Sequence, residues 1–182
     1  MTKITASYRY RAMPRTYYAL IIFYFMLFSC QKKTGDKHFE AEYPTIESID
    51  QIELLTNEGL TIDWKQYKGK IIFLNFWATW CGPCIKEMPS IQQVQELLSD
   101  HNIVFLLATE ENFDKINSFN TRHKLDLKFV RQKTSLAQLD ITALPTTYIF
   151  DTSGSLVFKE TSSRMWNDDE NVEFLNSFLQ PL

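Results

Sequence analysis

The chain has 182 residues, of which 45% are hydrophobic and 14% are aromatic, enough apolar material for the core of one domain. The formal net charge is −3 at neutral pH. This acidic balance argues against nucleic acid as a partner, because binding to a phosphate backbone requires an excess of lysine and arginine.

Residues 1–30 are predicted to be an export signal. Four basic residues precede an apolar run over 17–28, and residues 1–28 contain no acidic residue. This order is found in secretory signals. Leu27, Ser29 and Cys30 then resemble a bacterial lipobox, in which the cysteine is lipidated and becomes the mature N-terminus. The apolar run is shorter than the ~20 residues of a membrane-spanning helix. An uncleaved short anchor and cleavage without lipid are the alternatives. All three export the domain to an oxidising compartment of the cell envelope, the periplasm-facing side.

Removal of this leader also removes its four positive charges, so the net charge of the mature chain changes from −3 to −7. Such a surface is not expected to bind anionic lipid broadly. Residues 31–44 are polar and end at Pro44, which indicates a flexible tether, and residues 45–182 form the domain. With Cys30 used for the anchor, two cysteines remain for chemistry, and the fold must be held by its core.

The domain is predicted to begin with a β-hairpin. Residues 46–55 alternate in part between apolar and polar, Asn57-Glu58-Gly59 is a turn signal, and 60–62 would form the returning strand. A short helical turn over 63–68 follows. The nearly continuous apolar run Ile71–Trp77 is typical of a strand that is buried on both faces.

Two cysteines follow this strand in the sequence Trp80-Cys81-Gly82-Pro83-Cys84. Their spacing places both on one face of a helix's first turn, with the Cα separation of ~4.4–6.8 Å that a disulfide needs. Apolar residues then recur at helical spacing, at Ile85, Met88, Ile91, Val94 and Leu98. Pro89 is expected to kink this helix. Strand, dithiol and helix in this order predict a redox motif, with a structural pair or half of a metal site as the alternative.

The rest of the chain alternates strands and helices. Strands are predicted over 103–108 and 127–130, helical segments over 113–124, 135–139 and 168–179, and a hairpin over 147–151 and 155–159 around Thr152-Ser153-Gly154. This order predicts an α/β fold with a central mixed β-sheet covered on both faces.

The run from Lys68 to Cys84, with Glu87 and Pro89 beyond it, resembles the thioredoxin superfamily, and most of all its exported TlpA/ResA-type thiol-disulfide oxidoreductases. Residues 144–151, Leu-Pro-Thr-Thr-Tyr-Ile-Phe-Asp, resemble the cis-proline strand of the same family. The resemblance covers roughly residues 45–179. It implies a thioredoxin-like fold, with the predicted hairpin as an N-terminal extension, and an enzyme that needs no cofactor and no metal.

The two cysteines are assigned different roles because only a thiolate attacks a disulfide. Cys81 lies at the start of the helix, where free N–H groups and the helix dipole favour negative charge, so it is predicted to be the nucleophile. Cys84, one turn deeper, is predicted to resolve the mixed disulfide. Gly82 leaves room for a substrate backbone, and Pro83 is tolerated in the first turn. Because no charged residue between the cysteines stabilises the thiolate further, a protein-disulfide reductase is favoured over an oxidase or isomerase.

Three further positions are predicted to contact the substrate. Trp80 would form an exposed apolar lip beside Cys81, with core packing as the alternative, whereas Trp77 is expected in the core. By resemblance, the Leu144–Pro145 bond is cis and faces the dithiol, so that Leu144, Pro145 and Thr146 pair with a substrate segment and Pro145 keeps metal ions off the sulfurs. An ordinary trans proline is the alternative.

Glu87 is predicted to move protons. The resemblance implies an acid at this position that affects the thiol pKa, and a carboxylate near a thiol can pass protons. A surface glutamate paired with Lys86 is the alternative. Asn75 stands where cytosolic thioredoxins carry a proton-accepting aspartate, and since asparagine does not titrate, Glu87 or water must deprotonate Cys84.

The histidines and the remaining acids do not add a metal site. His38, His101 and His123 are scattered and are not expected to be ligands, which weakens the alternative of a copper-binding metallochaperone that uses the two thiolates. Glu110-Glu111, after the strand over 103–108, is predicted to be a solvated loop, with a place on the active-site side of the sheet as the alternative.

Partners follow from the predicted chemistry. The substrates would be protein thiols and disulfides. A dithiol in an oxidising compartment needs an electron donor, and the resemblance implies a membrane thiol-disulfide transporter. It also implies one known role in cytochrome c-type biogenesis, in which apocytochrome cysteines are kept reduced.

Overall fold

The computed structural model describes residues 46–179. These residues lie in one compact unit. The predicted leader, the tether and the lipidation site Cys30 lie outside the described residues. Within the described range, none of the helices combines the length and the apolar character needed to cross a membrane.

The unit is built on a six-stranded mixed sheet with the strand order β1-β4-β3-β2-β5-β6. The strands are β1 (Leu54–Leu55), β2 (Ile71–Phe76), β3 (Ile103–Thr109), β4 (Phe129–Gln132), β5 (Thr146–Phe150) and β6 (Leu156–Glu160). β2 pairs in parallel with β3 and antiparallel with β5, and all of its residues are buried. The apolar run before the dithiol is therefore a central strand, as its sequence predicted.

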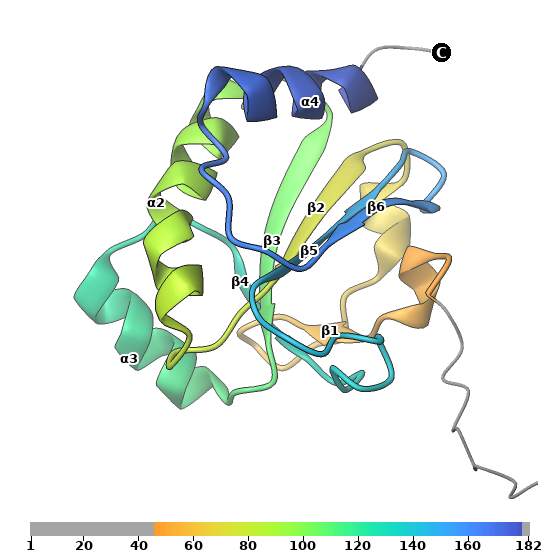
Figure 1. Cartoon of the computed structure of the whole chain (residues 1–182). Coiled ribbons are helices and arrows are strands. Elements are labelled where there is room, and N and C mark those ends of the chain that lie inside the picture. Colours follow the sequence, from red (N-terminus) through yellow and green to blue (C-terminus); the bar gives the residue numbers. More distant parts are fainter. Residues whose placement is uncertain (1–45, 180–182) are drawn as a thin grey trace, which may run out of the picture. The chain divides into compact units, whose positions relative to one another are not determined.

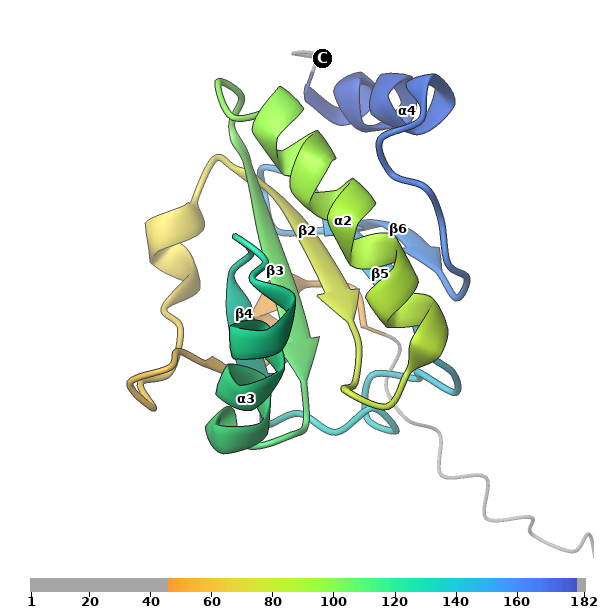
Figure 2. The same ribbon diagram turned by 90° about the vertical axis from the view of Figure 1, so that its left-hand side faces the viewer.

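Three α-helices pack on one face of this sheet (Figures 1 and 2): α2 (Gly82–Leu97), α3 (Phe113–His123) and α4 (Asp169–Leu179). Phe73 of β2 lies beneath them and meets Trp166 edge to face, with ring centroids 4.7 Å apart. Trp77, which directly follows β2, packs on Phe119 of α3 with centroids 4.7 Å apart. Trp77 is thus a core residue, as predicted.

Short helices and a turn cover the opposite face. The 3-10 helices η1 (Ile49–Gln51) and η2 (Trp64–Tyr67) and the turn around Leu139 pack on the alternate residues of β2, among them Leu74 and Phe76. Tyr148 of β5 reaches across and donates its hydroxyl to the carbonyl of Leu139. The sheet is covered on both faces as predicted, with its α-helices on one of them.

The N-terminal hairpin is shorter than the sequence predicted. Ser48 and Gln51 form a capping box that makes 49–51 a 3-10 helix, so the first strand is reduced to β1. Its return consists of one bridge, Leu55 to Thr61, and β1 instead pairs with β4 at the sheet edge. β4 itself begins two residues later than predicted.

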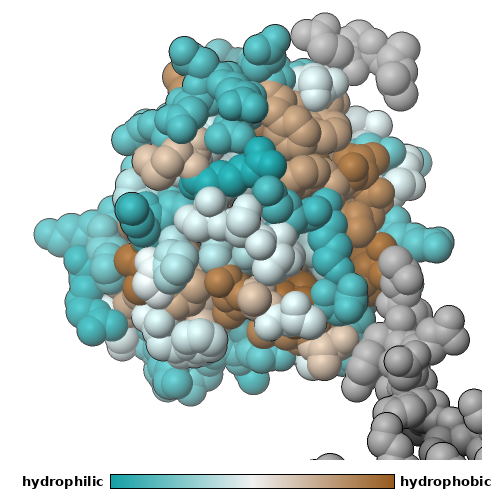
Figure 3. Space-filling model, viewed as in Figure 1, coloured by the Kyte–Doolittle hydropathy of each residue, from teal (hydrophilic) through white to brown (hydrophobic). Residues whose placement is uncertain are grey.

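Aromatic residues join α4 to the edge strand β6. Phe158 of β6 meets Phe174, and Phe174 meets Phe178, with ring centroids 4.9 and 5.0 Å apart. All three are only partly buried, and Figure 3 shows apolar surface between α4 and β6 on the side seen there.

Candidate active site

The two cysteines lie where the chain leaves β2 and enters α2. Cys81 is the N-cap of α2 and Cys84 lies in its first turn. They form a disulfide with Cα atoms 5.3 Å apart, within the range expected from their spacing. The Cys81 sulfur accepts the backbone N–H of Cys84 at 3.3 Å. A negative charge on the Cys81 sulfur would therefore face an N–H donor and the positive end of the helix.

The two sulfur positions differ in access. Cys81 is 4% exposed and Cys84 is fully buried. Gly82 and Pro83, between them, are exposed. Trp80 has 75% of its surface exposed, so the alternative that it packs in the core is wrong. The small exposed surface of the pair therefore belongs to Cys81, next to Trp80, and Cys84 has none.

The Leu144–Pro145 peptide bond is cis, so the alternative of a trans proline is wrong. Thr146, the first residue of β5, pairs with Phe76, the last residue of β2. Because α2 begins shortly after the end of β2, this register brings the cis bond to the sheet end at which α2 begins. Thr146 is fully buried and its hydroxyl donates to the carbonyl of Ala143, so its side chain does not reach the surface.

Glu87 is buried beneath this site rather than exposed on the helix. Its Oε1 accepts the side-chain N–H of Asn75 at 2.8 Å and its Oε2 accepts the backbone N–H of Arg164 at 3.0 Å. The alternative of a surface glutamate paired with Lys86 is therefore wrong. Burial raises the pKa of Glu87 to about 7, although the hydrogen bonds from Arg164 and Asn75 act in the opposite direction. Near neutral pH this carboxyl can hold or release a proton.

These features match a known family. The sequence model of Redoxin matches residues 36–174. The chain belongs to the Redoxin family. Its curated relatives include the thiol-disulfide oxidoreductase ResA of Bacillus cereus, 34% identical over 129 residues, which are 69% of this chain and 70% of the relative. They also include the thioredoxin-like protein YneN of Bacillus subtilis, 32% identical over 112 residues, 59% of this chain and 66% of the relative.

The solved structures of other proteins support the same fold. StoA of Bacillus subtilis superimposes with a TM-score of 0.56 and 22% identity, over 75% of this chain and all of StoA. A thioredoxin-family thiol:disulfide interchange protein of Chlorobium tepidum gives a TM-score of 0.56 and 24% identity, over 72% of this chain and 95% of the other. The chain is a ResA-like member of the thioredoxin superfamily. The matched part of the chain covers 66% of YneN and 70% of the Bacillus cereus ResA.

A segment that the sequence did not mark as functional lies along the dithiol helix. Ser163 donates its hydroxyl to the carbonyl of Pro83 at 3.4 Å, and the backbone N–H of Trp166 donates to Ser90 at 3.0 Å. Together with the bond from Arg164 to Glu87, they place this segment along one side of α2, from Pro83 between the cysteines to Ser90 two turns further on. The segment, residues 163–166, has no helical or strand periodicity. The one feature of its sequence that indicates burial is a tryptophan beside polar residues.

Glu111 also differs from its prediction. Its side chain is 11% exposed and accepts both the backbone N–H and the hydroxyl of Thr79, so it is not a solvated loop residue. Glu110 is exposed, as predicted, and accepts the backbone N–H of Leu136 at 3.0 Å.

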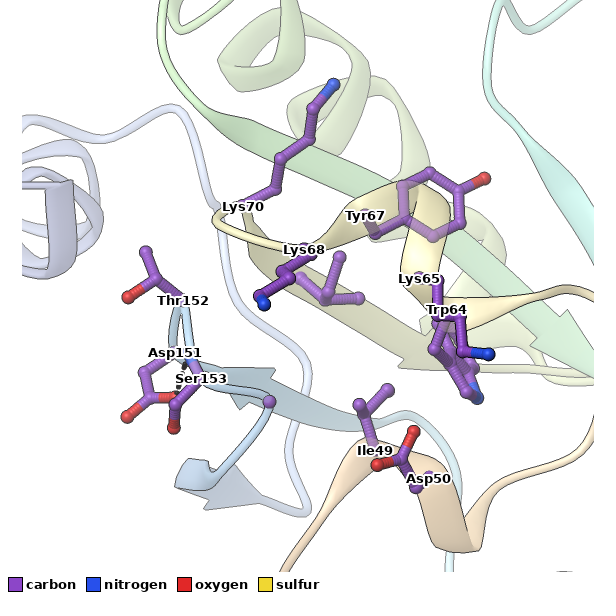
Figure 4. A pocket seen from close by; sticks show the side chains of 12 residues that line it. Ile49, Asp50, Trp64, Lys65, Tyr67, Lys68, Lys70, Asp151, Thr152 and Ser153 are labelled. Carbon is purple, nitrogen blue, oxygen red and sulfur yellow. Dashed lines mark hydrogen bonds between the residues drawn. The ribbon is translucent and has the colours of Figure 1, made fainter.

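The described residues contain no group of three histidine, cysteine or acidic side chains placed to hold a metal ion. His101 and His123 are exposed, and His38 lies outside the described range. A cavity of about 190 Å³ opens between η1, η2 and the turn over 151–154 (Figure 4). Its walls include Lys70 and Ile72, at the start of β2, so it lies at the opposite end of that strand from the dithiol. None of the candidate site residues lines it.

Proposed function

We propose that the protein is a thiol-disulfide oxidoreductase that reduces disulfides of other proteins through a mixed disulfide on Cys81. The observation that supports this proposal most directly is the difference between the two cysteines at the start of α2. Cys81 is the N-cap and keeps a small exposed surface beside the exposed Trp80 and Gly82, whereas Cys84 is fully buried. The names of its ResA relatives support the same chemistry.

The reaction has two exchange steps. The Cys81 thiolate attacks one sulfur of the substrate disulfide, a bond forms between these two sulfurs, and the other substrate sulfur leaves as a thiolate that takes up a proton. The Cys84 thiol then loses its proton and attacks the Cys81 sulfur, which expels the second substrate thiolate. Two electrons pass to the substrate and the Cys81–Cys84 disulfide remains, so a dithiol donor must reduce it again.

Glu87 is proposed to accept the proton of Cys84. Its position three residues further along α2, its burial and its pKa of about 7 support this role. Asn75, which contacts it, cannot titrate. Glu87→Gln should therefore slow the second step more than the first, so that the mixed disulfide accumulates in single-turnover experiments with a disulfide peptide. Turnover of the variant that equals wild type across pH 6–8 would refute this role.

Reduction is proposed as the physiological direction because Gly82 and Pro83 add no charge that would stabilise the reduced form. The reduction potential of the Cys81–Cys84 pair tests this. A potential above about −180 mV, in the range of isomerases and oxidases, would reverse the assignment.

The place of action is proposed from the leader. Export with a lipid on Cys30 would hold the domain at a membrane of the cell envelope, near a membrane dithiol donor and near newly exported protein thiols, including those of apocytochromes c.

The proposal is tested by trapping the intermediate. Reduced Cys84→Ser protein mixed with disulfide-bonded insulin should form a covalent adduct that dithiothreitol removes, because the second step is blocked. The matched double variant, with Cys81→Ser and Cys84→Ser, should form none. Absence of an adduct with the single variant, together with no insulin reduction by wild type, would refute the proposed activity.

A further inference from the structure

Four residues, 77–80, connect the end of β2 to Cys81. The backbone N–H of Trp77 donates to the carbonyl of Ala108 of β3, and the N–H of Cys81 donates back to Ala78 at 3.0 Å, which closes a turn. Trp80 is at the tip of this turn with most of its side chain in solvent. Packing of Trp80 therefore contributes little to the orientation of the turn.

Glu111 fixes this turn from outside. Its Oε2 accepts the backbone N–H of Thr79 at 2.6 Å, and its Oε1 accepts the Thr79 hydroxyl at 2.9 Å. Two hydrogen bonds from one carboxylate to one residue fix orientation as well as distance, and bonds to a charged acceptor are among the stronger ones. Thr79 lies two residues before Cys81.

Glu111 is itself held in place. Its backbone N–H donates to the Thr109 hydroxyl at the end of β3, and Lys115, one turn into α3, lies 3.3 Å from its Oε1. The Lys115 side chain is largely exposed, whereas that of Glu111 is nearly enclosed. Glu111 thus links the turn that precedes Cys81, through its carboxylate, to the end of β3, through its backbone N–H.

We propose that Glu111 is a positioning residue for the exchange reaction: it holds Thr79 so that Trp80 and Cys81 meet a folded protein substrate in one fixed orientation. This inference rests on the proposed oxidoreductase function. A displacement of about 1 Å in a reacting group can cost a hundredfold in rate. The hydrogen bonds from Thr79 to Glu111, two residues before the nucleophile, can therefore affect catalysis although Glu111 does not contact the substrate.

The neighbouring Glu110 provides a matched control. It carries the same side chain at the same end of β3, but it is exposed and its carboxylate accepts the N–H of Leu136. Glu110→Gln and Glu111→Gln each remove one negative charge from this region. Only Glu111→Gln changes the atoms that contact Thr79.

The test is the reduction of insulin by the full chain with excess dithiothreitol, measured as kcat/KM. Glu111→Ala removes both acceptors and should lower kcat/KM about tenfold. Glu111→Gln should stay within threefold of wild type, because its amide can accept the Thr79 N–H and donate to the Thr79 hydroxyl. Thr79→Val removes the hydroxyl bond alone and should fall between them, and Glu110→Gln should match wild type.

A second readout separates positioning from general damage. Reduced wild type and Glu111→Ala should attack dithiobis(nitrobenzoate), a small disulfide that needs no docking surface, at rates within threefold of each other. Equal losses with insulin and with the small disulfide would overturn the inference, as would a Glu111→Gln protein as impaired as Glu111→Ala, which would indicate an effect of charge. If Glu111→Ala does not fold, the insulin kcat/KM of Thr79→Val is the deciding measurement. A value equal to that of wild type overturns the inference.

Failure of this inference and failure of the proposed function give different results. If wild type reduces no insulin and Cys84→Ser traps no adduct, the proposed function is wrong. If wild type is active and the Glu111 and Thr79 variants match it, the positioning role of Glu111 alone is wrong.

Discussion

Replacement of Glu87 by glutamine should change how the stability of the protein depends on pH. In the folded protein the buried carboxyl keeps its proton up to about pH 7, whereas in the unfolded chain it ionises around its usual value of 4.5. Between these values the folded state binds more protons than the unfolded state, so this group makes the protein less stable as the pH rises. The loss is complete above about pH 7.

The size of the effect follows from the two pKa values. At 1.36 kcal/mol for each pH unit, the interval from 4.5 to about 7 corresponds to about 3 kcal/mol of unfolding free energy, of which about 2 to 3 kcal/mol falls between pH 5 and 8. Glutamine cannot ionise and should not show this loss. The unfolding free energy of Glu87→Gln minus that of wild type should therefore be about 2 to 3 kcal/mol larger at pH 8 than at pH 5.

The assay is urea unfolding of the oxidised protein at pH 5 and pH 8, with wild type and variant compared at each pH so that other titrating groups cancel. Glu96→Gln, which removes an exposed carboxylate from the same helix, controls for the loss of one charge. If the free-energy difference between wild type and Glu87→Gln is the same at both pH values, the burial argument for Glu87 is refuted.

Three further predictions concern other parts of the chain. Trp80→Ala should change the unfolding free energy by less than about 0.5 kcal/mol, because the side chain is exposed, but should lower kcat/KM for insulin severalfold; unchanged kinetics would remove its role as a docking lip. Phe73→Ala should cost about 3–5 kcal/mol in urea unfolding, because its ring is buried against Trp166, and a cost under 1 kcal/mol would contradict that packing. Cys30→Ser should abolish incorporation of labelled fatty acid in bacteria, and label retained by the variant would refute the lipid anchor.

The parts of the fold that could be predicted from the sequence are those with a local pattern. β2 is a run of consecutive apolar residues, and α2 has apolar residues at helical spacing after a helix-starting Cys81. The cis bond at Pro145 followed from resemblance, since an X–Pro sequence alone does not specify its isomer.

The parts that could not be predicted depend on contacts between distant residues. Thr79 and Glu111 are 32 positions apart, and Glu87 and Arg164 are 77 positions apart. A glutamate after a strand reads as solvated unless its partner is known, and the segment along α2 has neither periodicity nor turn chemistry. The short N-terminal strand has a local cause, because the capping box of Ser48 and Gln51 competes with an extended conformation.

The proposed chemistry requires that Cys81, at the start of α2, is the nucleophile and that the fully buried Cys84 is its protected partner. Brief alkylation of the reduced protein with iodoacetamide at a series of pH values, followed by mass spectrometry of the two peptides, measures this directly. Cys81 should be labelled below the ordinary thiol pKa of about 8.5, and Cys84 should stay unlabelled under the same conditions. Equal and slow labelling of both cysteines up to alkaline pH, or labelling of Cys84 first, would contradict the claim.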